Sequence, residues 1–239
     1  MKSCVIISGH SRGLGRALTE LYLRQGRKVI GLSRKGWEDS PEKLVEYSID
    51  FTDPEALSVL LRSAFWQNNL SDIDELILIN NAGTVEPTAL AGLQDSEAII
   101  HAININVTAP ILLTNAVIAM ATQATDIRIA HISSGAGRHA ISGWSVYGAT
   151  KAALDQHAAV IATEQHKHIR IASIAPGVVD TDMQQNIRAA DAKLFPDVQN
   201  FINMKANNKL QGTTDTAQSI ATMIAAAEYG QVVKRDVRE

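Results

Sequence analysis

A tyrosine and a lysine lie four residues apart in the stretch SVYGATKAAL, at positions 147 and 151. If this stretch is helical, Tyr147 and Lys151 lie on one face, one turn apart. A free phenol has a pKa of about 10, and a neighbouring cation favours its ionised form, so Lys151 is predicted to lower the pKa of Tyr147. A phenol tuned in this way can act as a general acid. The alternative is that both are ordinary residues of a helix surface.

A glycine-rich turn near the N-terminus indicates dinucleotide binding. The motif SGHSRGLG places Gly9, Gly13 and Gly15 between an apolar run and a helical pattern. Glycines allow a tight turn and let backbone amides approach a pyrophosphate, while the N-terminus of the helix adds partial positive charge. The position of the motif after the first predicted strand and before the first helix is the context that this interpretation requires.

The end of the second predicted strand favours NADP(H) over NAD(H). An NAD site usually has an acidic residue there, which binds the ribose 2′-hydroxyl. This chain has Ser33 and Arg34 instead, in GLSRKG. Arg34, together with Arg12 of the glycine turn, is predicted to pair with a 2′-phosphate. The alternative is that Arg34 is a solvated loop residue.

The elements that must position these residues alternate along the chain. Short apolar runs typical of buried parallel strands lie at 3–8, 28–34, 44–51, 73–83, 127–137 and 169–179. Helical patterns lie at 11–26, 54–69, 95–122 and 145–166. Asp53 is predicted to cap the second helix, with Pro54 in its first turn, and Pro110 to break or kink the third. We expect an α/β fold of Rossmann type, a single domain over 1–239 with a doubly wound parallel sheet and helices on both faces.

A polar segment at about 182–210, interrupted by Pro196, follows the last of these strands. Ligands bind at the carboxyl ends of strands in open α/β sheets, so this segment is predicted to form a substrate lid. The alternative is a pair of surface helices without a role in binding.

Composition argues against several classes of protein. The chain has 239 residues, 46% of them hydrophobic, and a net charge of −3, which gives no basic surface for nucleic acid. The single cysteine, Cys4, cannot form an internal disulfide, and no metal-ligand pattern is present. We find no leader pattern and no apolar run of about 20 residues, so we expect a cytoplasmic protein without a membrane span.

Five motifs in this order resemble the classical short-chain dehydrogenase/reductase family. They are SGHSRGLG, NNAG at 80–83, ISS at 132–134, YGATK at 147–151 and PGVVDT at 176–181. The combination of NNAGTVEP, ISSGAG and APGVVDTDMQ is similar to sepiapterin-reductase-like and benzil-reductase-like members. The resemblance covers essentially the whole chain.

The resemblance implies four catalytic residues. Tyr147 would protonate the carbonyl oxygen during reduction, and Lys151 would hold the nicotinamide ribose and lower the pKa of Tyr147. Ser134 would bind the substrate oxygen and stabilise negative charge that develops on it. Asn106 would fix its helix and a water that relays protons to Lys151.

The resemblance also implies contacts with the cofactor. Asp50 would contact the adenine, Asn81 and Gly83 the adenosine ribose, and Thr181 with the backbone of Val179 the nicotinamide carboxamide. The complete predicted cofactor set is Gly9, Arg12, Gly13, Leu14, Gly15, Ser33, Arg34, Asp50, Asn81, Gly83, Tyr147, Lys151, Pro176, Gly177, Val179 and Thr181.

Three of the assignments have rivals in the sequence. Ser133 is an alternative to Ser134, and Asn104 is an alternative to Asn106. Trp144 is predicted either to form a wall of the substrate pocket or to pack in the core. The predicted substrate contacts are Ser134, Trp144, Tyr147, Met183 and Gln184.

We therefore expect an NADPH-dependent reductase of an apolar or aromatic carbonyl compound, such as an α-diketone or a pterin side chain. A sensor that binds NADP(H) without turnover is the alternative, and an epimerase or dehydratase would need a larger substrate domain. A homodimer through helices 110–122 and 146–166 is expected, or a homotetramer. The tetramer is in doubt because the C-terminal segment GQVVKRDVRE is shorter than the glycine-rich end of many members.

Overall fold

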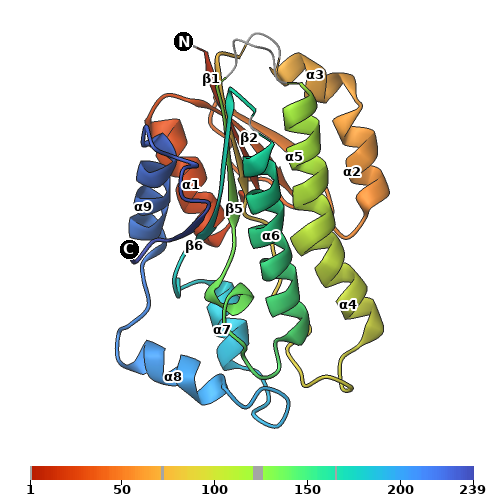
Figure 1. The fold of residues 1–239 in the computed structure, drawn as a ribbon, viewed down its shortest axis with the longest axis vertical. Helices are drawn as coiled ribbons and strands as arrows, with labels where there is room; N and C mark the ends of the chain where they lie inside the picture. Colours follow the sequence, from red (N-terminus) through yellow and green to blue (C-terminus); the bar gives the residue numbers. More distant parts are fainter. Residues whose placement is uncertain (1, 71–72, 121–125, 165) are drawn as a thin grey trace.

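One parallel sheet runs through the centre of the protein (Figure 1). The computed structural model describes residues 2–70, 73–120, 126–164 and 166–239. Within them the strands are β1 (Ser3–Ser8), β2 (Lys28–Ser33), β3 (Leu44–Ser48), β4 (Glu75–Asn80), β5 (Asp126–Ile132), β6 (Ile169–Ala175) and β7 (Lys234–Asp236). They lie in the order β3-β2-β1-β4-β5-β6-β7, and each neighbouring pair is parallel. Successive strands are added on one side of β1 as far as β3 and on its other side from β4 onwards, and ligands bind at this switch point in such sheets.

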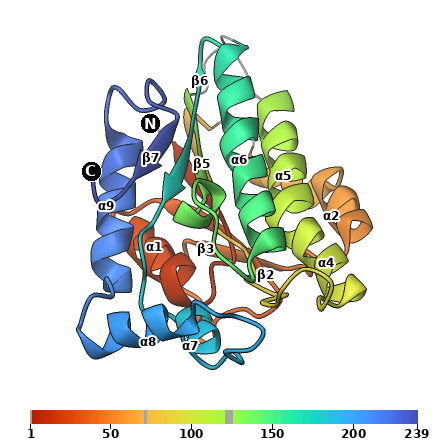
Figure 2. The same ribbon diagram turned by 60° about the horizontal axis from the view of Figure 1, so that its bottom comes forward.

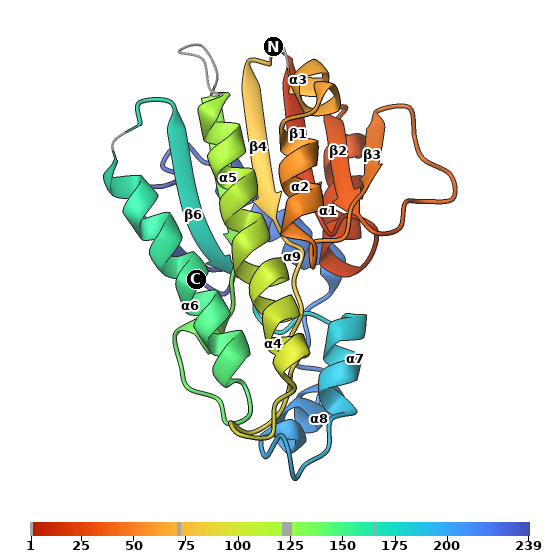
Figure 3. The same ribbon diagram turned by 90° about the vertical axis from the view of Figure 1, so that its right-hand side faces the viewer.

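Helices cover both faces of the sheet, as Figures 2 and 3 show. The helices α1 (Gly13–Arg24) and α9 (Thr213–Ala225) pack on one face, and α2 (Pro54–Leu61), α5 (Ala109–Ala119) and α6 (Ser145–Thr163) pack on the other. Successive side chains of β1 alternate between the layers, with Ile6 in the core on the α5 side and Ile7 in the core on the α1 side. The predicted doubly wound α/β fold is confirmed.

The pattern at 54–69 forms two helices, where one was predicted. Asp53 caps α2 as expected, since its carboxylate accepts bonds of 3.0 Å from the amides of Glu55 and Ala56. However, α2 ends at Leu61, and α3 (Ala64–Leu70) begins after a break. At that break both the amide and the hydroxyl of Ser63 donate to the carbonyl of Leu60, a local alternative to the helical bond.

The helix predicted at 95–122 is not broken at Pro110. It runs from α4 (Ser96–Ile103) through a π-helical turn (Asn104–Thr108) into α5. The amide of Ala109 bonds the carbonyl of Asn104, five residues back, and Pro110 follows directly. The wider π-helical turn accommodates Pro110, which has no N–H to donate within the helix. Residues 121–122 of the prediction lie outside the described part of the chain.

This helix is apolar enough to cross a membrane by length and composition alone, with a mean hydropathy of 1.5. It nevertheless belongs to the layer on the sheet (Figure 3). Leu113 and Val117 are fully buried in the core beneath it, whereas Ile100 and Ile103 on α4 are exposed.

The predicted lid segment contains α7 (Asp182–Arg188) and α8 (Val198–Ala206). Both helices lie together at the end of the molecule where α4 and α6 begin, beyond the carboxyl edge of the sheet (Figures 1 and 3). A third hydrophobic cluster joins this segment to the start of α6, and it includes Tyr147.

Candidate active site

Tyr147 lies in the first turn of α6 and close to the end of β5. Ser134 follows β5 with an extended backbone, and its hydroxyl accepts a bond of 3.2 Å from the amide of Ala136. The same side chain hydrogen-bonds the phenol of Tyr147. Only 8% of Tyr147 is exposed. Two hydroxyl groups therefore meet at the carboxyl edge of the sheet, where both can donate to one substrate oxygen.

The expected effect of Lys151 on Tyr147 is wrong in this structure. Burial raises the pKa of Tyr147, and the hydrogen bond with Ser134 opposes that rise. The phenol therefore stays protonated at neutral pH, which is the form that a proton donor needs. Spacing along the helix predicted the neighbour correctly but could not reveal how completely the site is closed to water.

Lys151 is buried below the phenol. Its ammonium donates a bond of 2.9 Å to the carbonyl of Ile132 and lies 5.7 Å from the centre of the Tyr147 ring. Burial lowers the pKa of Lys151 to about 8, while the negative charge of Asp155 opposes this change. A buried lysine near neutrality can exchange a proton with its surroundings, so Lys151 is suited to passing protons towards the phenol.

The side chain of Asn106 holds the loop after β4 against α6. Its oxygen accepts a bond of 2.8 Å from the amide of Thr84, and its nitrogen donates to the carbonyl of Thr84 at 2.8 Å and to the hydroxyl of Thr150 at 3.1 Å. Asn104 instead donates to the carbonyl of Thr52 at 3.0 Å, away from this loop. A Cβ on Gly83 would lie 3.3 Å from Asn106 and 3.5 Å from the Lys151 nitrogen. The geometry favours Asn106 as the asparagine of the site.

The two serines after β5 have different surroundings. Ser133 is buried and donates to the backbone carbonyl of Lys151 at 3.3 Å. It also contributes to holding the pKa of Asp155 low, although burial alone would raise it. Ser134, in contrast, contacts Tyr147. The geometry therefore favours Ser134 as the serine that can reach a substrate.

The glycine turn joins β1 to α1 through close backbone contacts. Gly9 and Gly13 have φ of 68° and 53°, which glycine adopts without strain. A Cβ on Gly15 would overlap the carbonyl oxygen of Gly9, so the helix could not approach the turn with a larger residue. Asn81 donates from its side chain to the carbonyls of Ser8 and Gly9 at 3.0 and 3.2 Å. The turn has the bare backbone that a pyrophosphate requires. The side chain of Leu14, which is also in the predicted cofactor set, lies in the hydrophobic core instead.

The two arginines predicted to bind a 2′-phosphate are both exposed. Arg34 lies 4.0 Å from the carboxylate of Asp50, and Arg12 lies 3.9 Å from that of Asp182. The pKa of Asp50 is below its usual range, chiefly because the amide of Thr52 bonds it. Both arginines can move to an anionic ligand at small cost, since exposed ion pairs are weak. Ser33 is the other residue predicted to contact the cofactor at the end of β2, and its hydroxyl donates to the carbonyl of Lys35 at 2.6 Å.

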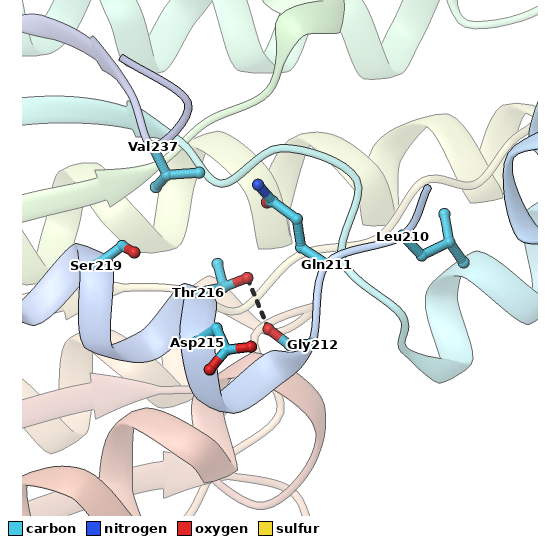
Figure 4. Close-up of a pocket in the computed structure, with 7 residues that line it drawn as sticks. All are labelled: Leu210, Gln211, Gly212, Asp215, Thr216, Ser219 and Val237. Atoms are coloured by element: carbon cyan, nitrogen blue, oxygen red, sulfur yellow. Dashed lines mark hydrogen bonds between the residues drawn. The ribbon is translucent and has the colours of Figure 1, made fainter. Parts of the chain in front are cut away.

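The loop 176–181 after β6 reaches the glycine turn. A Cβ on Gly13 would lie 3.3 Å from the methyl group of Thr181. Gly177 has a φ of 75°, and Val179 pairs with Gln211 in a β-bridge. A cavity of about 210 Å³ lies beside this loop. Figure 4 shows the residues that line it, Leu210, Gln211, Gly212, Asp215, Thr216, Ser219 and Val237. Pro176, Gly177, Val179 and Thr181 thus follow a strand end next to the turn that would hold the phosphates.

The predicted substrate residues have different places. Trp144 is in the third cluster, with ring centres 5.2 Å from Tyr147 and 4.9 Å from Phe195. Trp144 therefore packs in the core beside a residue of the site, and its role as a wall of the substrate pocket stays a prediction. Met183 packs against the same cluster. Gln184 is buried and accepts a bond of 3.3 Å from Arg188.

Sequence reasoning missed two aromatic residues of the segment 182–210. Phe195 is fully buried, and Phe201 lies with its ring centre 5.1 Å from that of Trp144. They are the only aromatic residues in the polar segment 182–210, a signal that could have found them. Among the residues described, no group of three or more histidine, cysteine, aspartate or glutamate side chains could hold a metal ion.

A sequence profile described as short chain dehydrogenase matches residues 3–192. The chain belongs to this family. A short-chain dehydrogenase is an oxidoreductase that uses a nicotinamide cofactor, and the bare glycine turn described above fits such a group.

Relatives with assigned activities match over much of the chain. This short-chain dehydrogenase is 32% identical over 245 aligned residues to a benzil reductase, (S)-benzoin forming, from Bacillus cereus, with 97% of this chain and 98% of the relative covered. It is 31% identical to the NADP-dependent 3-hydroxy acid dehydrogenase YdfG of Escherichia coli K12, with 77% and 75% covered. The predicted similarity to benzil-reductase-like members is confirmed.

A solved structure adds to these relatives. The crystal structure of a short-chain dehydrogenase/reductase from Burkholderia vietnamiensis has 37% sequence identity and a TM-score of 0.72, with 80% of this chain and 93% of that chain covered.

Proposed function

We propose that this short-chain dehydrogenase reduces a ketone or aldehyde carbonyl to the alcohol with NADPH. The observation that carries the proposal is the pair of Ser134 and Tyr147 hydroxyls above the buried Lys151. Bound NADPH would supply the hydride for the carbonyl carbon. Ser134 would hold the carbonyl oxygen, and Tyr147 would give it a proton. Lys151 would then return a proton to the phenolate.

We propose that the cofactor lies across the ends of β1 and β4. The glycine turn, Asn81 and Gly83 would hold its phosphates and adenosine, and the loop 176–181 its nicotinamide end. NADPH is supported by the two exposed arginines, Arg12 and Arg34, and by the NADP dependence of a named relative. Arg34→Ala should raise the KM for NADPH about tenfold and change that for NADH little, because a charge-assisted bond is lost only with the phosphate. Equal changes for both cofactors would contradict this assignment.

We propose an aromatic carbonyl compound, such as a diketone or a pterin, as the substrate. Trp144, Phe195 and Phe201 cluster with Tyr147 and would give a substrate bound there an aromatic neighbourhood. The relatives named as benzil reductases act on a substrate of this class by name. The segment 182–210 would act as the lid, because its aromatic side chains pack on Trp144, which contacts the ring of Tyr147.

The test is NADPH oxidation with aromatic diketones, quinones and pterins. Tyr147→Phe should reduce turnover by about a thousandfold and keep NADPH binding, because only the proton donor is removed. Tyr22→Phe is the matched control, since the Tyr22 hydroxyl is buried without a hydrogen-bond partner and far from these residues in the fold. An active Tyr147→Phe would refute the assignment of the acid. Binding of NADPH without turnover on any carbonyl would favour the sensor.

We also propose a cytoplasmic homodimer or homotetramer. The outer sides of α4 and α6 support it, because Ile100 and Val160 are 59% and 46% exposed there. Parts of the two helices expected at such an interface, residues 121–122 and 165, lie outside the described chain. Light scattering after size exclusion would measure the mass, and a monomer at micromolar concentration would contradict the proposal.

A further inference from the structure

A histidine is buried inside the glycine turn. His10 is enclosed, with 1% of its side chain exposed, and its Nε2 lies 2.6 Å from the carboxylate of Glu46 on β3. Between them in the sheet is Gly31 of β2, which pairs in register with Glu46. A Cβ on Gly31 would overlap the imidazole ring. The ring therefore takes the space that a side chain of β2 would fill.

The carboxylate of Glu46 collects donors from two separate segments. It accepts a bond of 2.9 Å from the amide of Trp37 and another from the hydroxyl of Ser40. Burial alone would raise its pKa, but the bonds from Ser40, His10 and Trp37 outweigh it and hold the pKa below the usual range. An ionised carboxylate only accepts hydrogen bonds, so His10 donates through its Nε2.

These bonds join the glycine turn to the segment 34–40 that follows β2. A Cβ on Gly36 would lie 3.2 Å from both oxygens of Glu46, so this segment rests directly on the carboxylate. Arg34 belongs to the same segment. The guanidinium of Arg16 lies 4.7 Å from the centre of the Trp37 ring. A cavity of about 410 Å³ lies between the two segments, lined by Ser11, Arg16, Gly36, Trp37, Glu38 and Asp39.

We propose that His10 is a positioning residue for cofactor binding, which fixes the glycine turn relative to the segment that carries Arg34 and so sets the preference for NADPH over NADH. The inference rests on the proposed function. A 2′-phosphate can reach Arg34 only if the turn that holds the pyrophosphate and this segment keep a fixed separation. Short bonds to a half-buried, ionised carboxylate supply that rigidity.

Three variants test the link between the segments. His10→Ala removes the donor, and Gly31→Ala displaces the ring without changing either bonded group. His10→Gln keeps an N–H that can reach Glu46. KM and kcat are measured for NADPH and NADH, and the Kd of NADPH is measured by titration calorimetry without substrate.

We expect His10→Ala and Gly31→Ala to raise the KM and Kd for NADPH about tenfold, with kcat at saturating NADPH within about twofold. The preference for NADPH over NADH should fall by a similar factor, and His10→Gln should recover most of both. Tyr229→Phe is the control, because it also removes a short buried bond, of 2.6 Å to the carbonyl of Ile129, away from the turn. It should lower the melting temperature and leave the KM unchanged.

Two results would overturn the inference. One is an unchanged KM and Kd for NADPH in His10→Ala, with only a lower melting temperature. The other is an equal rise in KM for NADPH and NADH, which would mean that the bond supports the turn without selecting the cofactor. Failure of the proposed function itself would be distinct, since no carbonyl would be reduced while the calorimetric effect of His10→Ala persisted.

Discussion

Lys151→Met should stabilise the cofactor-free protein at pH 7 while it removes activity. Burial lowers the pKa of Lys151 from its ordinary 10.5 to about 8. At about 1.4 kcal/mol for each pKa unit, the charged form costs the folded state roughly 3 kcal/mol. The variant also loses the bond to Ile132, worth about 1 kcal/mol. The net gain in the free energy of unfolding is about 2 kcal/mol.

The gain should depend on pH in a defined direction. The pKa of Lys151 is lower in the folded state than its ordinary 10.5. Its charge therefore lowers the free energy of unfolding by the full amount below about pH 8, and has no such effect above pH 10.5. Wild type should therefore approach the stability of Lys151→Met as pH rises from 8 to 10.5, and exceed it slightly above that range. Urea denaturation at several pH values measures the difference, and NADPH oxidation measures the loss of turnover, expected to be about a hundredfold.

Lys43→Met is the matched control for burial. Lys43 also donates to a backbone carbonyl, that of Gly26 at 3.0 Å, but it is exposed. Its replacement should change the free energy of unfolding by less than about 0.5 kcal/mol at every pH. If Lys151→Met were no more stable than wild type at pH 7, or if its advantage did not shrink towards pH 10, the assignment of a buried charge would be refuted.

Two further perturbations address the loop after β4 and the lid. Asn106→Ala should lower the free energy of unfolding by about 2–4 kcal/mol, since three hydrogen bonds are lost, whereas Asn104→Ala loses one and should cost about 1 kcal/mol. Equal costs in urea denaturation would contradict this difference. Gly143→Ala should cost about 1–3 kcal/mol, because Gly143 has a φ of 86° and a Cβ there would lie 2.9 Å from Phe195. It should also raise the KM for substrate more than it lowers kcat. An unchanged KM would contradict the proposal that Gly143 supports a lid formed by the segment 182–210.

The sheet and the glycine turn could be predicted because their signals are local. Apolar runs fix the parallel strands, and Gly9 and Gly15 stand where backbone contacts exclude a side chain. Asp53 and Pro54 likewise report a helix start from neighbouring residues alone. Each of these features depends on contacts within a few residues or on a periodic pattern.

Other features depend on which distant residues meet. The π-helical turn lies where Asn106 bonds Thr84 of another loop, so no pattern within the helix indicates it. The pKa of Tyr147 rises because the residue is buried in a cluster that includes side chains of the segment 182–210, and spacing along one helix carries no information on that burial. His10 and Glu46 meet only through the register of neighbouring strands.

The pairing of α1 with α9 has a consequence for synthesis of the chain. Leu14, Leu18 and Leu21 of α1 pack with Ile220 and Ile224 of α9 in one core. Domains begin to form from the N-terminus as the ribosome releases the chain. The part of the apolar side of α1 that faces α9 therefore remains uncovered until α9 emerges, and β7 joins the sheet only after that. During most of synthesis that part of α1 is an exposed apolar surface, which favours aggregation.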